Sequence, residues 1–148
     1  MTLPDLRLSD PLPADLEPGM YWLHTRLEAP AVVARFERDG WATSVVDLEV
    51  GTDKAGMLEV FAHRLGFPGW VGRTWDALDD ALGDLSWWPA GPRGRLIVVR
   101  GAEPDRGAVE GDHQVLLDVL ETAVAGWSAS DSPLVVLLCQ SRACTKRP

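Results

Sequence analysis

Apolar residues recur every three or four positions in three segments of the chain, a spacing that predicts three amphipathic helices. The first helix begins at 52–54 and ends near Leu65. The second begins after Thr74, whose hydroxyl can cap it, and the third runs from His113 to about Ala125 after Asp112 as its cap. Their expected buried positions are Met57, Leu58, Phe61 and Leu65; Trp75, Leu78, Leu82 and Leu85; and Val115, Leu116, Val119, Leu120 and Ala123.

Continuous apolar runs predict two strands, at 95–100 and 134–138, each covered on both faces. A third strand is expected at 41–48, where aromatic and β-branched residues are frequent. Strands and helices alternate from residue 41 onward. This alternation favours a parallel sheet with crossover connections.

The first 40 residues are expected to extend this unit. Residues 1–19 contain four prolines among scattered leucines and are predicted to form an irregular arm. Residues 20–27 and 31–37 are rich in aromatic and β-branched types, which predicts two more strands. The pair Asp39-Gly40 is typical of a tight hairpin turn into the strand at 41–48. The sequence therefore predicts an antiparallel extension in front of the parallel sheet.

The composition fits one acidic globular domain. A chain of 148 residues with 46% hydrophobic content can bury one compact core. Its formal charge of -8 argues against nucleic acid or an anionic membrane as a direct partner, because both attract basic surfaces. No apolar run approaches the roughly 20 residues that span a bilayer, and the N-terminus lacks the pattern of a signal peptide. We therefore expect a cytoplasmic protein that is a monomer when free and binds a basic protein.

The chain has two cysteines, Cys139 and Cys144. Reduced thiols are the simplest interpretation for a cytoplasmic chain, and a small C-terminal disulfide loop is the alternative. Neither cysteine has a histidine nearby in the sequence that would activate it. No catalytic residue is predicted from this pair.

The second predicted helix carries acidic residues on the side opposite its apolar stripe. Asp76, Asp80 and Asp84 are spaced four residues apart, and Asp79 flanks them. Like charges at this spacing repel, and no basic residue of the helix offsets them. A solvated acidic face is the plain structural interpretation. A surface for a positively charged partner is the alternative, favoured by Trp70, which lies in a glycine-containing loop without apolar periodicity to explain its burial.

The stretch 66–89 resembles the barstar family of intracellular inhibitors of guanyl-specific ribonucleases. The family pattern is a proline followed by aromatics, a glycine, and a helix that reads Asp-Ala-Leu-x-Asp-x-Leu. The matching residues, all in the same register, are Pro68, Trp70, Gly72, Asp76, Ala77, Leu78, Asp80 and Leu82. A weaker similarity extends over 42–139.

The resemblance implies a fold and a partner. The fold is a three-layer α/β unit with a small parallel three-stranded sheet flanked by helices. The whole chain is then one domain, with an extension at 1–40, a family core at 42–139 and a tail at 140–148. The partner is a basic secreted ribonuclease or ribonuclease toxin domain, whose active-site cleft is blocked by an acidic helix that takes the place of RNA phosphates.

The resemblance also implies contact residues. The central contacts are Asp76, Asp80 and Trp70, with the backbone at 72–74 close to the partner. With the rest of the acidic block, the candidate site comprises Trp70, Gly72, Arg73, Thr74, Asp76, Asp79, Asp80 and Asp84.

Three positions depart from the family pattern. Asp79 stands where the family has a tryptophan, and Trp70 stands where it has a tyrosine. A glutamate on the last helix also touches the nuclease in the family. The nearest alignment places Thr122 there, with Glu121 one step aside.

Two other functions are weighed against inhibition. Asp76, Asp79 and Asp80 offer the oxygen ligands that Mg²⁺ or Ca²⁺ prefers, but carboxylates on one helix cannot surround an ion without further donors. The chain also lacks a phosphate-binding glycine loop, a histidine pair and a Gly-x-Ser-x-Gly motif, so no enzyme, metal or other cofactor is predicted. An acidic module that binds a basic partner other than a nuclease stays open as the alternative.

Overall fold

The computed structural model describes residues 5–7, 16–25, 28–48, 52–101 and 110–139. The predicted loop after the strand at 95–100 lies largely outside these residues, as do the C-terminal tail and most of the predicted N-terminal arm. The elements within them are β1 (Asp5–Arg7), β2 (Met20–His24), α1 (Ala29–Arg38), β3 (Trp41–Asp47), α2 (Lys54–Arg64), α3 (Trp75–Asp84), β4 (Gly94–Arg100), α4 (Glu110–Trp127) and β5 (Leu134–Cys139).

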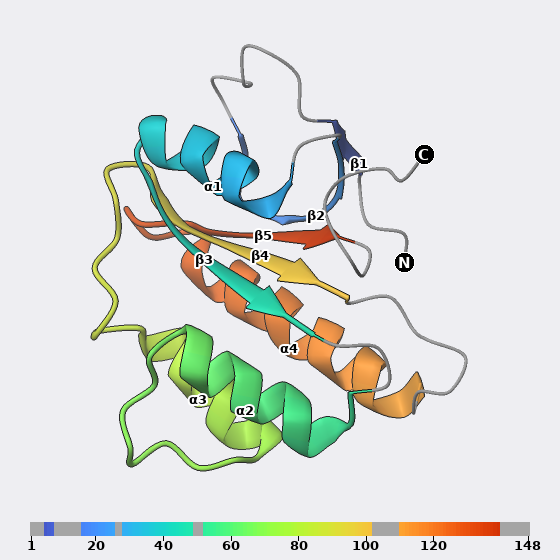
Figure 1. Cartoon of the computed structure of the whole chain (residues 1–148). Coiled ribbons are helices and arrows are strands. Elements are labelled where there is room, and N and C mark those ends of the chain that lie inside the picture. The colour runs from blue at the N-terminus through green and yellow to red at the C-terminus, as the bar shows by residue number, and fades with distance from the viewer. Residues whose placement is uncertain (1–4, 8–15, 26–27, 49–51, 102–109, 140–148) are drawn as a thin grey trace.

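The strands form one sheet in the order β1-β2-β5-β4-β3, and every neighbouring pair is parallel. β5, the last strand of the described chain, lies at the centre of the sheet (Figure 1). The predicted parallel sheet is present as β3, β4 and β5. The predicted number of three strands is too low, because β2 and β1 continue the sheet beyond β5.

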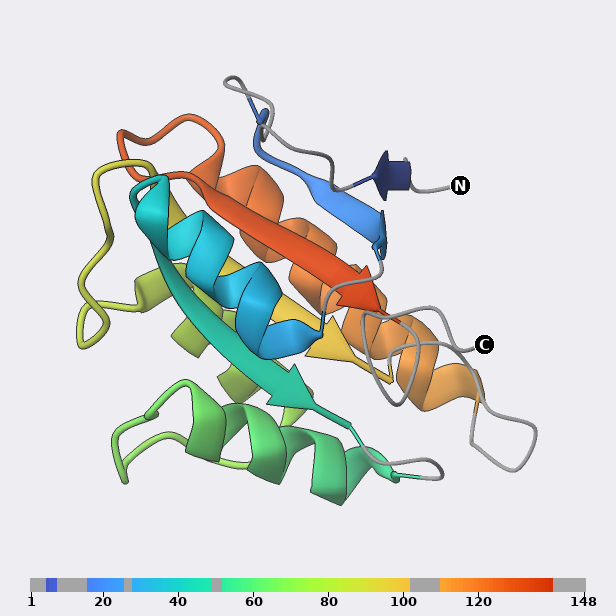
Figure 2. The same cartoon turned by 45° about the horizontal axis from the view of Figure 1, so that its top comes forward.

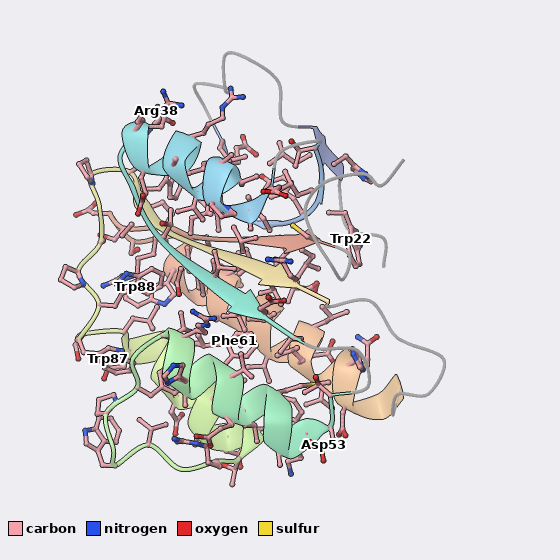
Figure 3. The ribbon with its side chains drawn as sticks, in the orientation of Figure 1. Trp22, Arg38, Asp53, Phe61, Trp87 and Trp88 are labelled. Carbon is pink, nitrogen blue, oxygen red and sulfur yellow. The ribbon has the colours of Figure 1, made fainter. Side chains whose placement is uncertain are left out.

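Helices cover both faces of the sheet, which gives three layers. α1 lies on one face, and α2, α3 and α4 lie on the other (Figures 1 and 2). Alternate residues of β4 point to the two sides, so that Ile97 packs with α2, α3 and α4, whereas Leu96 packs with α1. Figure 3 shows Phe61 of α2 beneath the sheet, where its side chain is fully buried. The predicted burial of β4 and β5 on both faces is confirmed.

The predicted strand at 31–37 is wrong, because this segment belongs to helix α1. Pro30 lies in the first turn of α1, where its fixed φ favours a helix start. The buried positions Ala29, Val32 and Phe36 have helical spacing, which outweighs the strand preference of the β-branched residues. Gly40, with φ of 102°, follows the helix and redirects the chain into β3.

The predicted antiparallel extension is therefore wrong as well. β2 is a strand, as expected, but it pairs in parallel with β5, with Met20 opposite Val136. α1 then carries the chain across one face of the sheet from β2 to β3 at the opposite edge (Figure 2). A parallel connection of this kind needs a crossover, and α1 supplies it.

The three predicted helices are confirmed with small differences at their ends. α2 begins at Lys54 with Asp53 as its N-cap, and Gly66, with φ of 67°, follows it. α4 begins at Glu110, two residues before the predicted cap Asp112. The expected apolar positions are buried, except that Trp75, Val115 and Val119 are half-buried. No helix of the described part is long and apolar enough to cross a bilayer.

Cys139 at the end of β5 is buried and disulfide-bonded. The interpretation of both cysteines as reduced thiols is therefore wrong, and the alternative of a disulfide agrees with the structure. Cys144 lies outside the described residues. The cytoplasmic location and the monomeric state stay predictions.

Candidate partner-binding surface

α3 is held by a cap at each end. The Thr74 hydroxyl accepts a hydrogen bond from the Ala77 N–H over 3.0 Å, which confirms the predicted N-cap. At the other end Leu85 adopts the left-handed conformation, with φ of 48°, that usually favours glycine. Its side chain is fully buried, so core packing offsets the cost of about 1–2 kcal/mol for this conformation. The helix is therefore fixed in position on its apolar side.

Arg95 of β4 binds the C-terminal end of α3. Its Nε donates to the Trp88 carbonyl over 2.7 Å, and its Nη2 donates to the Leu85 carbonyl over 3.2 Å. The guanidinium also lies over the Trp127 ring, 4.9 Å from the centroid. Burial lowers the pKa of Arg95, but an arginine keeps its charge at neutral pH. One buried cation thus joins β4, α3 and α4.

The loop between α2 and α3 is built around an aromatic group. Trp87, which follows α3 (Figure 3), donates from Nε1 to the Leu65 carbonyl over 3.0 Å. Phe67 meets its ring edge-on at 5.6 Å between centroids, and Trp70 does so at 6.4 Å. Trp70 is nevertheless 74% exposed. Trp87 therefore packs on the core and also contacts Trp70, the predicted contact residue.

An ion pair fastens the same loop to α2. Arg73 donates from Nε to Glu59 over 2.9 Å and from Nη1 to the Val71 carbonyl over 2.8 Å. Gly72 and Thr74 on either side are exposed. The predicted backbone contact at 72–74 is thus accessible, while the charge of Arg73 is already paired.

The acidic residues of α3 all face solvent. Asp76, Asp79, Asp80 and Asp84 are exposed, and none forms an ion pair within the described residues. In the same part of the chain no group of three potential ligand side chains is arranged to hold a metal ion. The predicted arrangement of an apolar side and an acidic side on one helix is confirmed.

The structure adds a groove that the sequence did not predict. It has a volume of about 670 Å³ and lies between α3 and α4. Thr122 lines it, whereas Glu121 does not, which places Thr122 beside the acidic helix. Its full lining is Asp79, Asp80, Gly83, Asp84, Thr122, Ala123, Gly126, Trp127 and Ser130. In the sequence, only the glycines on the two helices indicate this groove. A glycine occurs within a helix for many other reasons, so this signal is not specific.

Together these features define a parallel α/β domain that exposes an acidic helix and, in the loop before that helix, an aromatic ring. The family model for barstar, described as a barnase inhibitor, matches residues 41–139, well over half of the chain. The chain belongs to the barstar family. Members of this family are inhibitors and not enzymes, and at the level of the family the partner is a barnase-type ribonuclease. No curated protein sequence matches the chain.

The family match begins at Trp41, the first residue of β3. β1, β2 and α1 therefore precede the matched part. They supply the outer edge of the sheet and the helix on its second face.

Proposed function

We propose that the chain inhibits a barnase-type, guanyl-specific ribonuclease or a ribonuclease toxin domain by placing α3 in the basic active-site cleft. The observation that carries this proposal is the exposure of Asp76 and Asp80 without an ion pair in the described residues, together with a Trp70 ring that is 74% exposed in the loop before the same helix. If these carboxylates were turned inward or paired with arginines of the same chain, they could not bind the cationic groups of a partner.

The chemistry of the cleft supports this assignment. A ribonuclease binds phosphate groups with arginine, lysine and histidine side chains, which stabilise the negative charge of the reacting phosphate. Carboxylates held on a rigid helix can bind the same groups. Asp80 is the central ligand in this proposal and Asp76 the second, and inhibition follows from occupation of the cleft without any reaction of the inhibitor.

The charge of the molecule supports fast association. The chain carries a formal charge of -8, and a ribonuclease that binds RNA is basic. Opposite charges steer the two proteins together, so the association rate should fall as salt concentration rises. Trp70 gives the contact an apolar part that salt does not weaken, because its exposed ring can stack on an aromatic or histidine ring in the cleft.

A titration against purified barnase-type ribonuclease tests the proposal. The rate of RNA cleavage should fall as the chain is added, and Asp80→Ala should raise the inhibition constant by about 30-fold or more. Glu28→Ala is the matched control, because Glu28 is exposed at the start of α1 on the other face of the sheet and makes no side-chain cap bond. Equal inhibition by wild type and Asp80→Ala would contradict the site assignment.

Capture of partners from the producing cell tests the kind of partner. We expect the full chain to retain a small basic ribonuclease or the nuclease part of a larger toxin. Capture of a basic protein without nuclease activity would instead support the alternative of an acidic interaction module. An Asp80→Ala bait separates specific capture from retention by net charge alone, since it changes the formal charge of -8 by only one unit.

A further inference from the structure

The loop that joins α2 to α3, residues 66–74, carries Trp70 on a tight turn (Figure 1). The Val71 N–H donates to the Pro68 carbonyl over 3.0 Å, which places Gly69 and Trp70 at the two central positions of the turn. Val71 is the only buried residue of this loop, and its exposed fraction is 6%. A turn that one apolar side chain anchors to the core thus presents Trp70 to solvent.

The backbone of the turn has little restraint of its own. Gly69 and Gly72 lie on either side of Trp70 and Val71, and glycine loses more conformational freedom on ordering than any other residue. A Cβ atom at Gly69 would meet nothing within 4 Å, and one at Gly72 would meet Ala77 at an ordinary contact distance of 3.7 Å. No crowding around these glycines holds the turn, so its conformation depends on side-chain contacts.

Arg73 supplies one of these contacts. Its Nη1 donates to the Val71 carbonyl over 2.8 Å, and its Nε donates to Glu59 of α2 over 2.9 Å. Both the N–H and the carbonyl of Val71 are therefore hydrogen-bonded. Because the guanidinium is planar and its donors have fixed directions, the bond to Glu59 also orients the donor that reaches Val71. The guanidinium thus connects the turn to α2.

The charge of Arg73 needs an explanation on this surface. The neighbouring helix α3 exposes a row of carboxylates, and an unpaired arginine beside them would repel a basic partner. Glu59 neutralises this charge. The two side chains of the pair are 43% and 67% exposed, so the ion pair adds little to the stability of the fold. Its role is better explained by the turn that it holds in place.

We propose that Glu59 is a positioning residue of the partner-binding surface, which acts through Arg73 on the turn that presents Trp70. The inference rests on the proposed function, because the surface that it orders is the one that meets the nuclease. It adds a residue of α2 to a surface otherwise assigned to the loop and to α3. A partner then meets Trp70 on an ordered turn and does not have to remove the freedom of two glycines.

Nuclear magnetic relaxation of backbone ¹⁵N in the free chain tests this positioning without a nuclease. The amide order parameters at 69–72 should be near the value of about 0.85 that is typical of a rigid backbone. Glu59→Gln and Arg73→Gln should both lower them. Glu28→Gln is the matched control, because it removes the same charge at the exposed start of α1 and should change nothing in the loop. Equal order parameters in wild type and both loop variants would overturn the proposal.

Inhibition of a barnase-type ribonuclease tests the same contact through the sign of one effect. Arg73→Gln removes a positive charge from a surface that meets a basic cleft, so loss of charge alone would strengthen inhibition. If Arg73 holds the turn, inhibition should instead weaken by about three- to tenfold, as expected when the binding conformation is populated only about a third to a tenth of the time. Stronger inhibition by Arg73→Gln would contradict the positioning role.

Glu59→Gln should weaken inhibition at least as much as Arg73→Gln, because it frees the turn and also leaves an unpaired cation facing the partner. The double variant should be no weaker than Glu59→Gln alone, since the two residues act as one unit. Urea denaturation should show nearly unchanged midpoints for all three variants, because both positions are exposed. Additive losses in the double variant would mean that Glu59 does not act through Arg73.

The two measurements separate this inference from the proposed function. If the chain inhibits a ribonuclease and Glu59→Gln inhibits it equally well, the positioning role is wrong and the proposed function stands. If the chain inhibits no barnase-type ribonuclease, the proposed function is wrong, and the order parameters at 69–72 decide whether Glu59 holds the turn.

Discussion

The ring of Trp70 meets the ring of Trp87 edge-on, with 6.4 Å between centroids and an interplanar angle of 89°. Trp87 is itself fixed by the bond from its Nε1 to the Leu65 carbonyl. This contact orients an exposed side chain without burying it. A partner that binds Trp70 therefore has less side-chain entropy to remove than it would for a freely rotating indole.

Substitution of these two tryptophans should separate binding from stability. Trp70→Ala should weaken nuclease inhibition by about 30-fold or more while changing the free energy of unfolding by less than about 1 kcal/mol, because the ring is exposed. Trp87→Ala should lower the free energy of unfolding by about 2–4 kcal/mol, because it removes packing and a hydrogen bond. Urea denaturation and an inhibition assay measure the two effects. Similar losses of stability in both variants would contradict this division.

The two ends of α3 should respond oppositely to the loss of a carboxylate. Asp76 lies in the first turn, where the helix dipole favours a negative charge, and Asp84 is the last residue of the helix, where it does not. Asp76→Asn should lower the free energy of unfolding by about 0.3–1 kcal/mol, and Asp84→Asn should raise it by a similar amount. Thermal denaturation at low salt should show the opposite signs, and both effects should shrink at 1 M salt. Shifts of the same sign would argue against the dipole as their cause.

Arg95 should be essential for the position of α3. Arg95→Met removes two hydrogen bonds to backbone carbonyls and the contact with Trp127, and leaves the buried carbonyls of Leu85 and Trp88 with fewer donors. We expect a loss of about 2–4 kcal/mol in the free energy of unfolding. Arg93→Met is the matched control, since Arg93 makes a partly exposed ion pair with Asp39 and its loss should cost about 1 kcal/mol or less. Equal losses for Arg95→Met and Arg93→Met in urea denaturation would show that the buried contacts of Arg95 add no stability beyond that of an exposed ion pair.

Helix α1 should be part of the same cooperative unit as the family core. Phe36 is 2% exposed and packs with the sheet face that includes Leu96 and Val98. Phe36→Ala should therefore lower the free energy of unfolding by about 3–5 kcal/mol, as much as Phe61→Ala on the other face. Far-ultraviolet circular dichroism and tryptophan fluorescence should report one coincident transition in urea. Two separate transitions would mean that residues 1–40 form a unit of their own, contrary to the single domain that we propose.

The local signals in the sequence were sufficient for α3 and its surface. The cap at Thr74, the apolar spacing behind it and the acidic residues in front all depend on residues within one helix. They predicted which carboxylates are exposed, and the neighbouring loop was enough to single out Trp70. These features could be predicted because the period of a helix decides which residues share a face, whatever tertiary contacts form later.

The features that the sequence did not predict depend on competing or distant signals. In α1, the β-branched Val32 and Val33 favour a strand locally, and Asp39-Gly40 suits a hairpin as well as the end of a helix. Packing on the second face of the sheet decides in favour of the helix. The groove forms only when α3 and α4 pack together and bring Gly83 and Gly126, which are far apart in the chain, to its walls. No local pattern contains that relationship.

The central place of β5 has a consequence for how the protein is made. β5 pairs with β4 on one side and with β2 on the other, and its residues leave the ribosome after all the other elements described. The sheet is thus incomplete until β5 has been made, and the pairing of Met20 with Val136 must join residues that are far apart in the chain. A nascent chain can hold α3 against a complete core only after β5 has left the ribosome. Protection against a nuclease should therefore begin only after β5 has joined the sheet, and truncation before β5 should leave none.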